Sequence, residues 1–112
     1  MIEDYRFGRI TIDGREYTAD VIVYPDRVDD GWWRKAGHSL CMADLEDILG
    51  FGPDVLVIGT GANGLMKVPE DVRRALRERG IEPRPAPTAE ACDLYNELAG
   101  AATVVAALHL TC

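Results

Sequence analysis

Apolar strands alternate with amphipathic helices through the second half of the chain, and this alternation limits the fold more than any other feature. Residues 55–58 form a continuous apolar run, typical of a strand covered on both faces. We predict a helix between Pro69 and Gly80, a strand over residues 81–86, a helix between Thr88 and Gly100 and a strand over residues 103–110. Because crossovers between parallel strands are right-handed, these strands form a parallel β-α-β-α-β unit.

The residues of two of these strands predict their places in the sheet. Residues 103–110 are almost wholly apolar, which favours a position near the sheet centre. Pro83 and Pro85 remove backbone donors from the strand at 81–86, which favours the edge.

The first half of the chain predicts an antiparallel hairpin and a short helix. Two strands, residues 7–12 and 17–24, flank Asp13-Gly14, a pair that tolerates the positive φ angles of a tight turn. Capping residues and a terminal glycine predict a short helix over residues 44–50. We therefore predict a single α/β domain over residues 1–112, a three-layer sandwich whose mixed sheet has an N-terminal antiparallel hairpin followed by the parallel unit.

The balance of charge argues against a nucleic-acid partner. The chain has 12 Lys and Arg against 19 Asp and Glu, a net charge of −7 at pH 7. Such a field repels a polyanion unless a basic patch overcomes it. The arginines between residues 73 and 79 lie among acidic residues at helical spacing, which predicts a salt-bridged surface. We therefore expect no nucleic-acid binding.

The chain carries no pattern for a membrane span, a secretion signal or a metal site. No window approaches the roughly 18 apolar residues that cross a bilayer, and residues 1–6 lack a basic segment followed by an apolar run. Cys41, Cys92 and Cys112 include no C-x-x-C pair, which argues against a disulfide framework and a zinc site. We expect a cytoplasmic protein with no cofactor and no metal, and a buried, unreactive Cys92.

A glycine-rich loop, residues 59–64, spells G-x-G-x-x-G directly after an apolar strand. In a dinucleotide fold this loop runs straight into a helix, but residues 65–68 separate it here from Pro69. Two alternatives remain: a turn that lets strand and helix pack closely, or a small-anion site at the carboxyl ends of the strands. The candidates for ligand binding are Gly59, Thr60, Gly61, Gly64, Lys67, Thr88, His38 and His109.

The sequence offers no set of nucleophile, base and orienting group. The only serine, Ser39, lies outside any G-x-S-x-G turn. His38 and His109 have no partner close in sequence, and a histidine in an apolar strand is typical of a satisfied core residue. We identify no catalytic residues and favour a protein that is not an enzyme.

Several short motifs in a fixed order resemble one small family. They are Trp33, Gly37-His38, Asp44-Leu45, Val57-Ile58-Gly59-Thr60-Gly61, Pro69-Glu70, Gly80-Ile81, Thr88-Ala89-Glu90-Ala91, Tyr95-Asn96 and Val105-Ala106-Ala107-Leu108. From about Tyr5 onward the chain is similar to the domain of unknown function 498 family, which includes the mitochondrial complex I assembly factor three. The resemblance implies a three-layer α/β fold with a mixed sheet. In the mitochondrial branch it also implies help in assembling NADH:ubiquinone oxidoreductase through protein contacts, with no established catalytic reaction.

Our leading hypothesis is therefore a non-enzymatic protein-interaction or assembly-factor module that has a protein partner. The candidates for its interface are Trp32, Trp33, Asp44, Tyr95 and Asn96. Because neighbouring side chains on an extended segment point to opposite faces, at most one of the two tryptophans lies fully in the core. The alternative is a small-molecule or anion-binding protein, with or without a catalytic step, that uses residues 59–64 and the nearby histidines.

Overall fold

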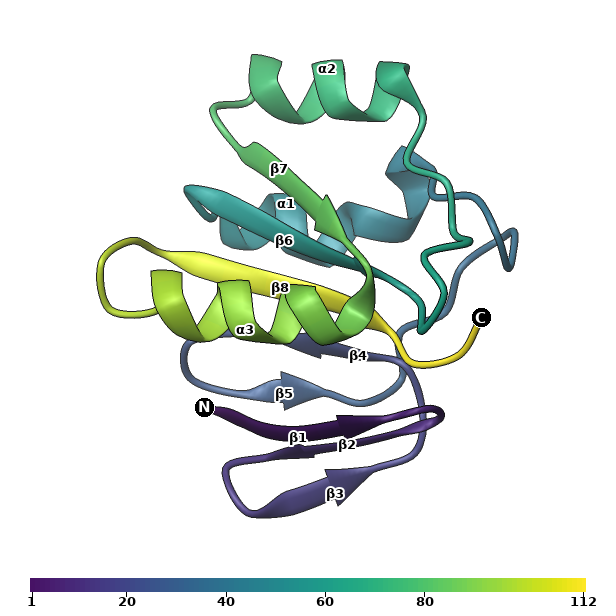
Figure 1. Ribbon diagram of the computed structural model, residues 1–112. Coiled ribbons are helices and arrows are strands. Elements are labelled where there is room, and N and C mark those ends of the chain that lie inside the picture. The colour runs from purple at the N-terminus through teal and green to yellow at the C-terminus, as the bar shows by residue number, and fades with distance from the viewer.

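A five-stranded mixed sheet forms the middle layer of the computed structural model, which describes all of residues 1–112 (Figure 1). The strand order is β5-β4-β8-β6-β7. The strands are β4 (Val21–Val23), β5 (Val28–Asp29), β6 (Val55–Thr60), β7 (Glu82–Ala86) and β8 (Val104–His109). Strands β6, β7 and β8 are parallel, whereas β4 runs antiparallel to both β8 and β5. The predicted mixed α/β fold is confirmed, with β8 at the centre and the proline-bearing β7 at the edge.

Helices cover both faces of this sheet. One face packs against α1 (Glu46–Phe51), the 3₁₀ turn η1 (Met42–Leu45) and α2 (Glu70–Glu78), and the other against α3 (Thr88–Leu98). Side chains alternate along a strand, so Ile58 lies in the core under α1 and α2 while Val57 lies in the core under α3. The three predicted layers are therefore present, with a separate apolar core on each side of the sheet.

The N-terminal residues form a second sheet, which sequence patterns did not predict. It is antiparallel and consists of β1 (Ile2–Arg6), β2 (Arg9–Ile12) and β3 (Arg15–Tyr17). The predicted turn at Asp13-Gly14 joins β2 to β3, with φ of 49° and 81° at the two residues. The strand predicted over residues 17–24 is instead divided between β3 and β4. The break falls at Asp20, whose carboxylate accepts a hydrogen bond from the Leu110 N–H.

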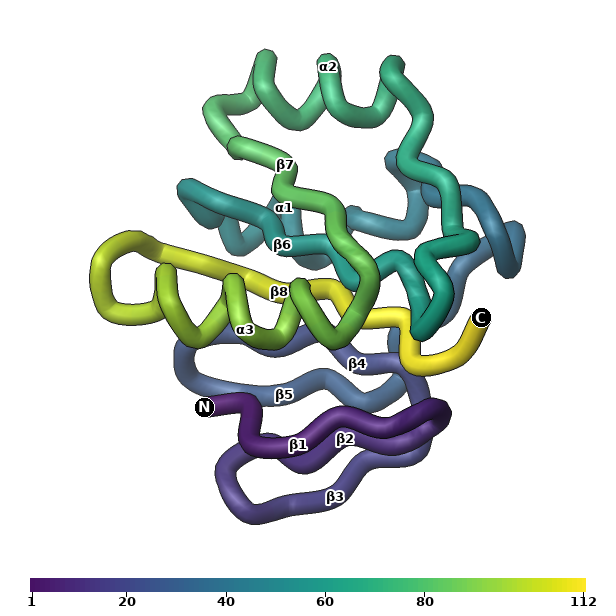
Figure 2. The backbone as a smooth tube through the Cα atoms, viewed as in Figure 1, coloured from purple at the N-terminus to yellow at the C-terminus, as the bar shows by residue number.

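The carboxyl ends of β6 and β8 lie side by side, with Thr60 opposite His109. The segment after β8 lies alongside the glycine-rich loop that follows β6 (Figure 2). This edge of the sheet therefore gathers most of the candidate ligand-binding residues. No helix in the structure is long and apolar enough to cross a membrane.

Candidate functional site

The backbone donors of the glycine-rich loop are already occupied. The N–H groups of residues 61–64 donate, in order, to Thr88 Oγ1 and to the carbonyls of Thr111, Cys112 and Gly61, over 2.9–3.2 Å. A phosphate-binding loop needs free N–H groups directed at its ligand. Residues 61–64 have none, so this loop's backbone cannot cradle an anion as it stands.

The glycines of the loop are required by close packing. A Cβ on Gly59 would lie 2.9 Å from both Leu108 Cδ2 and Thr88 Oγ1. Gly61 has a φ of 106°, and a Cβ there would overlap the Thr111 carbonyl. Gly64 has a φ of 68° and faces the Pro87 ring. These contacts support the packing alternative for the G-x-G-x-x-G pattern.

Thr88 joins the loop, α3 and β8. Its side chain is fully buried. The hydroxyl accepts a hydrogen bond from the Gly61 N–H at 2.9 Å and donates to the His109 carbonyl at 2.6 Å. The sequence pattern predicts Thr88 as the helix cap, but the N-cap of α3 is Pro87, with no side-chain cap bond. The hydroxyl is not available for capping because it bridges to β8.

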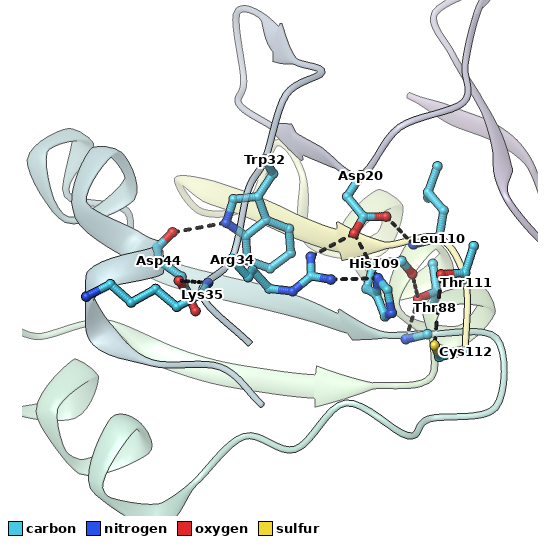
Figure 3. A network of polar contacts seen from close by, with 11 residues as sticks. Asp20, Trp32, Arg34, Lys35, Asp44, Thr88, His109, Leu110, Thr111 and Cys112 are labelled. Atoms are coloured by element: carbon cyan, nitrogen blue, oxygen red, sulfur yellow. Dashed lines mark hydrogen bonds and ion pairs between the residues drawn. The ribbon is translucent and has the colours of Figure 1, made fainter. Parts of the chain in front are cut away.

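A buried charged group, which we call the Asp20 cluster, consists of Asp20, Arg34 and His109 (Figure 3). Asp20 Oδ2 lies 2.7 Å from Arg34 Nη1 and 2.8 Å from His109 Nδ1. The other carboxylate oxygen accepts the Leu110 N–H at 2.8 Å. Burial alone would raise the pKa of the Asp20 carboxyl, but the hydrogen bonds from Leu110, Arg34 and His109 outweigh burial and lower the pKa.

One ring nitrogen of His109 has two partners in the Asp20 cluster. His109 Nδ1 lies between a carboxylate, which only accepts, and Arg34 Nη2 at 2.9 Å, which only donates. A ring that carries a proton on Nδ1 donates to the Asp20 carboxylate. Nε2 is buried without a partner, and so is Arg34 Nε. The cluster therefore holds two buried nitrogens that lack a partner.

His109 lies on the central strand, next to both Asp20 and β6. Its Nδ1 faces Asp20, which directly precedes β4. Strand β8 lies between β4 and β6, where Thr60 is the register partner of His109. Thr60 lines an open pocket, whereas His109 is buried and does not line it.

That pocket, which we call the β6–β7 pocket, has a volume of about 610 Å³ and opens at the carboxyl ends of β6 and β7. Its polar side chains are Ser39, Thr60, Lys67 and Arg73. Two backbone hydrogen bonds join the loops on one side: Lys67 N–H donates to the His38 carbonyl at 2.7 Å, and Leu40 N–H donates to the Lys67 carbonyl at 2.9 Å. Backbone hydrogen bonds therefore hold this side of the pocket in place.

The β6–β7 pocket differs from the other main pockets in its charge. Its charged lining residues, Lys67 and Arg73, are both basic. Three of the other four main pockets are lined by carboxylates, and the fourth has no charged side chain. Neither basic residue forms an ion pair. Arg73 Nε donates to the Val68 carbonyl at 3.2 Å, which leaves its two terminal nitrogens free.

The structure separates the candidate ligand-binding residues into two groups. Thr60, Gly64 and Lys67 line the β6–β7 pocket. The others do not line it: Gly59, Gly61, Thr88 and His109 are buried, and the His38 side chain is exposed. Only the backbone carbonyl of His38 contributes, by holding Lys67.

Sequence reasoning missed Asp20, Arg34 and Arg73 as site residues. Asp20 is the only charged residue in the apolar stretch 17–24, and that signal was available. Arg34 follows two tryptophans in a loop and carried no signal. Arg73 was grouped with a salt-bridged helix surface, but Arg77 forms the only arginine ion pair of α2, with Glu82.

Four of the five candidate interface residues have structural roles. Trp32 is buried and donates from Nε1 to the Asp44 carbonyl at 3.0 Å. The Asp44 carboxylate accepts the N–H groups of Lys35 and Cys41, each at 3.0 Å. Tyr95 lies in the core under α3.

The other two candidates are Asn96, which also has a structural role, and Trp33, which lies on the surface. Asn96 binds the Ile2 backbone twice, at 2.9 and 2.7 Å, and so attaches β1 to α3. Trp33 is 73% exposed, so it is the one candidate whose side chain is largely available on the surface.

The fold defines a class of small mixed α/β proteins with a three-layer core, and comparison with known proteins identifies the family. A sequence profile described as "Protein of unknown function (DUF498/DUF598)" matches residues 2–109. The chain belongs to this family, as the resemblance predicted.

Solved structures agree with this assignment. The crystal structure of the conserved hypothetical protein PH1505 from Pyrococcus horikoshii is 32% identical, with a TM-score of 0.87 over 100% of this chain and 99% of that one. A structure named MT938 is 30% identical, with a TM-score of 0.81 over 100% and 98% of the two chains. A Bordetella pertussis protein described as an Mth938-like domain shares the fold at 18% identity and a TM-score of 0.71, over 97% and 84%.

Proposed function

We propose that this protein binds a small anion in the β6–β7 pocket through side chains, not through the glycine-rich backbone. The observation that supports the proposal is the pairing of Lys67 with Arg73 in a pocket without carboxylates, in a chain of net charge −7. Two cations that face one pocket repel each other, and an anion between them replaces repulsion with attraction. The amide donors that a loop site would need are occupied within the fold.

Each polar side chain has a distinct part in this proposal. Lys67 supplies a mobile point charge, and the free terminal nitrogens of Arg73 supply a planar fork for two oxygens. The hydroxyls of Ser39 and Thr60 form no hydrogen bond within the protein, so they are free to donate to the same ligand.

A thermal-shift titration with inorganic phosphate at low salt tests this function. A ligand at a hundredfold excess over its dissociation constant stabilises the folded state by about 2.7 kcal/mol. We expect Lys67→Ala and Arg73→Ala to remove the shift. Arg74→Ala is the matched control, because Arg74 is exposed on the same helix, does not line the pocket and carries the same charge. An undiminished shift in the pocket variants, or no shift in the unaltered protein, overturns the proposal.

A second function, a protein-interaction or assembly module, is supported by Trp33. Tryptophan is enriched among the residues that dominate binding energy in protein interfaces, and 73% of this one is exposed. Affinity capture from the native host with the unaltered protein and Trp33→Ala tests it. We expect a partner that is recovered with the former and lost with the latter, while both proteins unfold at the same temperature. Equal recovery with both excludes Trp33 as the anchor.

A further inference from the structure

We propose that the ligand of the β6–β7 pocket is a phosphate monoester with a compact apolar body. This inference rests on the anion-binding function proposed above and specifies the chemical class of the ligand. It comes from the charge of the pocket, the separate segments that supply its donors and the apolar wall at the end of β7.

The charge of the pocket matches a dianion. Lys67 and Arg73 contribute two positive charges, and no lining carboxylate offsets them. A phosphate monoester carries about −1.5 to −2 at pH 7, whereas a simple carboxylate carries about −1. A carboxylate would leave one of the two cations uncompensated. Glu70 and Asp71 begin α2 nearby, but neither lines the pocket.

The donors reach the pocket from separate segments of the chain. Ser39 comes from the loop before η1, Thr60 from the end of β6, Lys67 from the segment before α2 and Arg73 from the first turns of α2. A flat carboxylate has two oxygens in one plane, whereas a phosphate presents three terminal oxygens in different directions. Donors on several sides therefore suit a tetrahedral head.

One wall of the pocket, at the end of β7, offers apolar contact and no side-chain donor. It is lined by Pro85, Ala86 and Pro87. Pro85 and Pro87 also lack a backbone N–H. A ligand body that continues from the phosphate along this wall gains from apolar contact, whereas the hydroxyl groups of a sugar would find no partner on the wall itself.

Isothermal titration at fixed ionic strength tests the ligand class with four probes: inorganic phosphate, butyl phosphate, phenyl phosphate and benzoate. We expect phenyl phosphate to bind at least tenfold more tightly than either inorganic phosphate or benzoate. We expect butyl phosphate to bind more tightly than inorganic phosphate by about two- to fourfold per carbon of its chain, because the pocket is open and buries each group in part. Arg73→Ala removes binding of the phosphates, and Arg74→Ala leaves it unchanged.

A variant of the apolar wall provides a measurement that does not depend on overall stability. Pro85→Ser replaces a ring on the edge strand β7 with a small polar side chain. We expect it to reduce the preference for phenyl phosphate over inorganic phosphate while the affinity for inorganic phosphate stays the same. A preference that is unchanged in this variant contradicts a role for the wall.

The remaining outcomes separate this inference from the function on which it rests. If inorganic and phenyl phosphate bind equally, and Arg73→Ala removes both, the anion-binding function stands and the proposed apolar body of the ligand is wrong. If benzoate binds as tightly as phenyl phosphate, the ligand is not specifically a phosphate monoester, and the anion-binding function stands. Absence of binding by all four probes overturns both proposals.

Discussion

At the scale of single residues, Asp20 connects three segments at the carboxyl end of the sheet. It accepts hydrogen bonds from Leu110, from Arg34 in the loop after β5 and from His109 on β8. All three side chains of the Asp20 cluster are largely buried, with 18%, 6% and 7% exposure for Asp20, Arg34 and His109. Removing one partner of a buried ion pair leaves the other charge uncompensated, which destabilises a protein by about 3–5 kcal/mol.

We therefore expect Asp20→Asn to lower the free energy of unfolding by about 3–5 kcal/mol at neutral pH. The matched control is Asp26→Asn, because Asp26 pairs with Arg27 on the surface, and we expect a change within about 0.5 kcal/mol. Urea unfolding of both variants at pH 7 provides the measurement. Similar losses in the two variants would contradict the role of the cluster.

The lowered pKa of Asp20 also predicts how stability depends on pH. The folded state binds a proton at Asp20 less readily than the unfolded state, so this stabilisation is present above the unfolded pKa of about 3.9. It is lost as the pH falls through the folded pKa. We expect the free energy of unfolding to decline below about pH 4 more steeply in the unaltered protein than in Asp20→Asn. Parallel curves would show that other carboxylates cause the decline.

Gly61 is the glycine whose replacement is most restricted. It combines a φ of 106° with a carbonyl where a Cβ would stand, so Gly61→Ala has to shift the segment that follows β8. We expect a loss of about 2–4 kcal/mol in urea unfolding. Gly37→Ala is the control, because nothing lies within 4 Å of a Cβ there and its φ is not positive. A loss at Gly37 as large as that at Gly61 would contradict the packing explanation.

At the scale of elements, the second half of the chain could be predicted and the first half only in part. β6 and β8 are continuous apolar runs, and α2 and α3 begin and end near the residues that predicted them. By contrast, β1 has charged and exposed residues at most of its positions, so no alternation identifies it as a strand. Its place is determined by pairing with β2 and by a side chain distant in sequence.

That side chain is Asn96, which attaches the three-stranded sheet to α3. Its amide accepts from the Ile2 N–H and donates to the Ile2 carbonyl. We expect Asn96→Ala to destabilise the protein by about 1–3 kcal/mol and to speed amide hydrogen exchange in β1 more than in β8. The exposed Asn63 provides the control, Asn63→Ala, since its side chain forms no hydrogen bond. Unchanged exchange in β1 would exclude Asn96 as its anchor.

The sequence predicted where the candidate site lies in the fold, but not all of the residues that form it. Ligands of open α/β sheets bind at the carboxyl ends of the strands, and the β6–β7 pocket lies there. Thr60, Gly64 and Lys67 were predicted because they lie at the end of β6 or shortly after it in the sequence. Arg73 reaches the same pocket from α2, and Asp20 and Arg34 meet His109 from segments far away in the sequence. Residues that meet from distant segments of the chain leave no local pattern in the sequence.

At the scale of the whole molecule, the acidic excess and the basic pocket occupy different halves of the chain. Residues 1–52 carry 6 basic and 11 acidic residues, or −5, and residues 53–112 carry 6 and 8, or −2. Lys67 and Arg73 belong to the second half. The overall field opposes the approach of an anion, so we expect affinity for phosphate to fall only slightly with added salt, as screening weakens attraction and repulsion together.

The central place of β8 has a consequence for how the protein is made. Strands β4 and β6 each pair with β8 and not with each other, and β8 follows both in the chain. During synthesis the β4-β5 and β6-β7 pairs emerge as separate ribbons with open apolar edges, and only the arrival of β8 joins them. Pairings this distant in sequence slow folding and prolong the interval in which unfinished chains can aggregate. We therefore expect the yield of this protein to depend on protection from aggregation until β8 has been made.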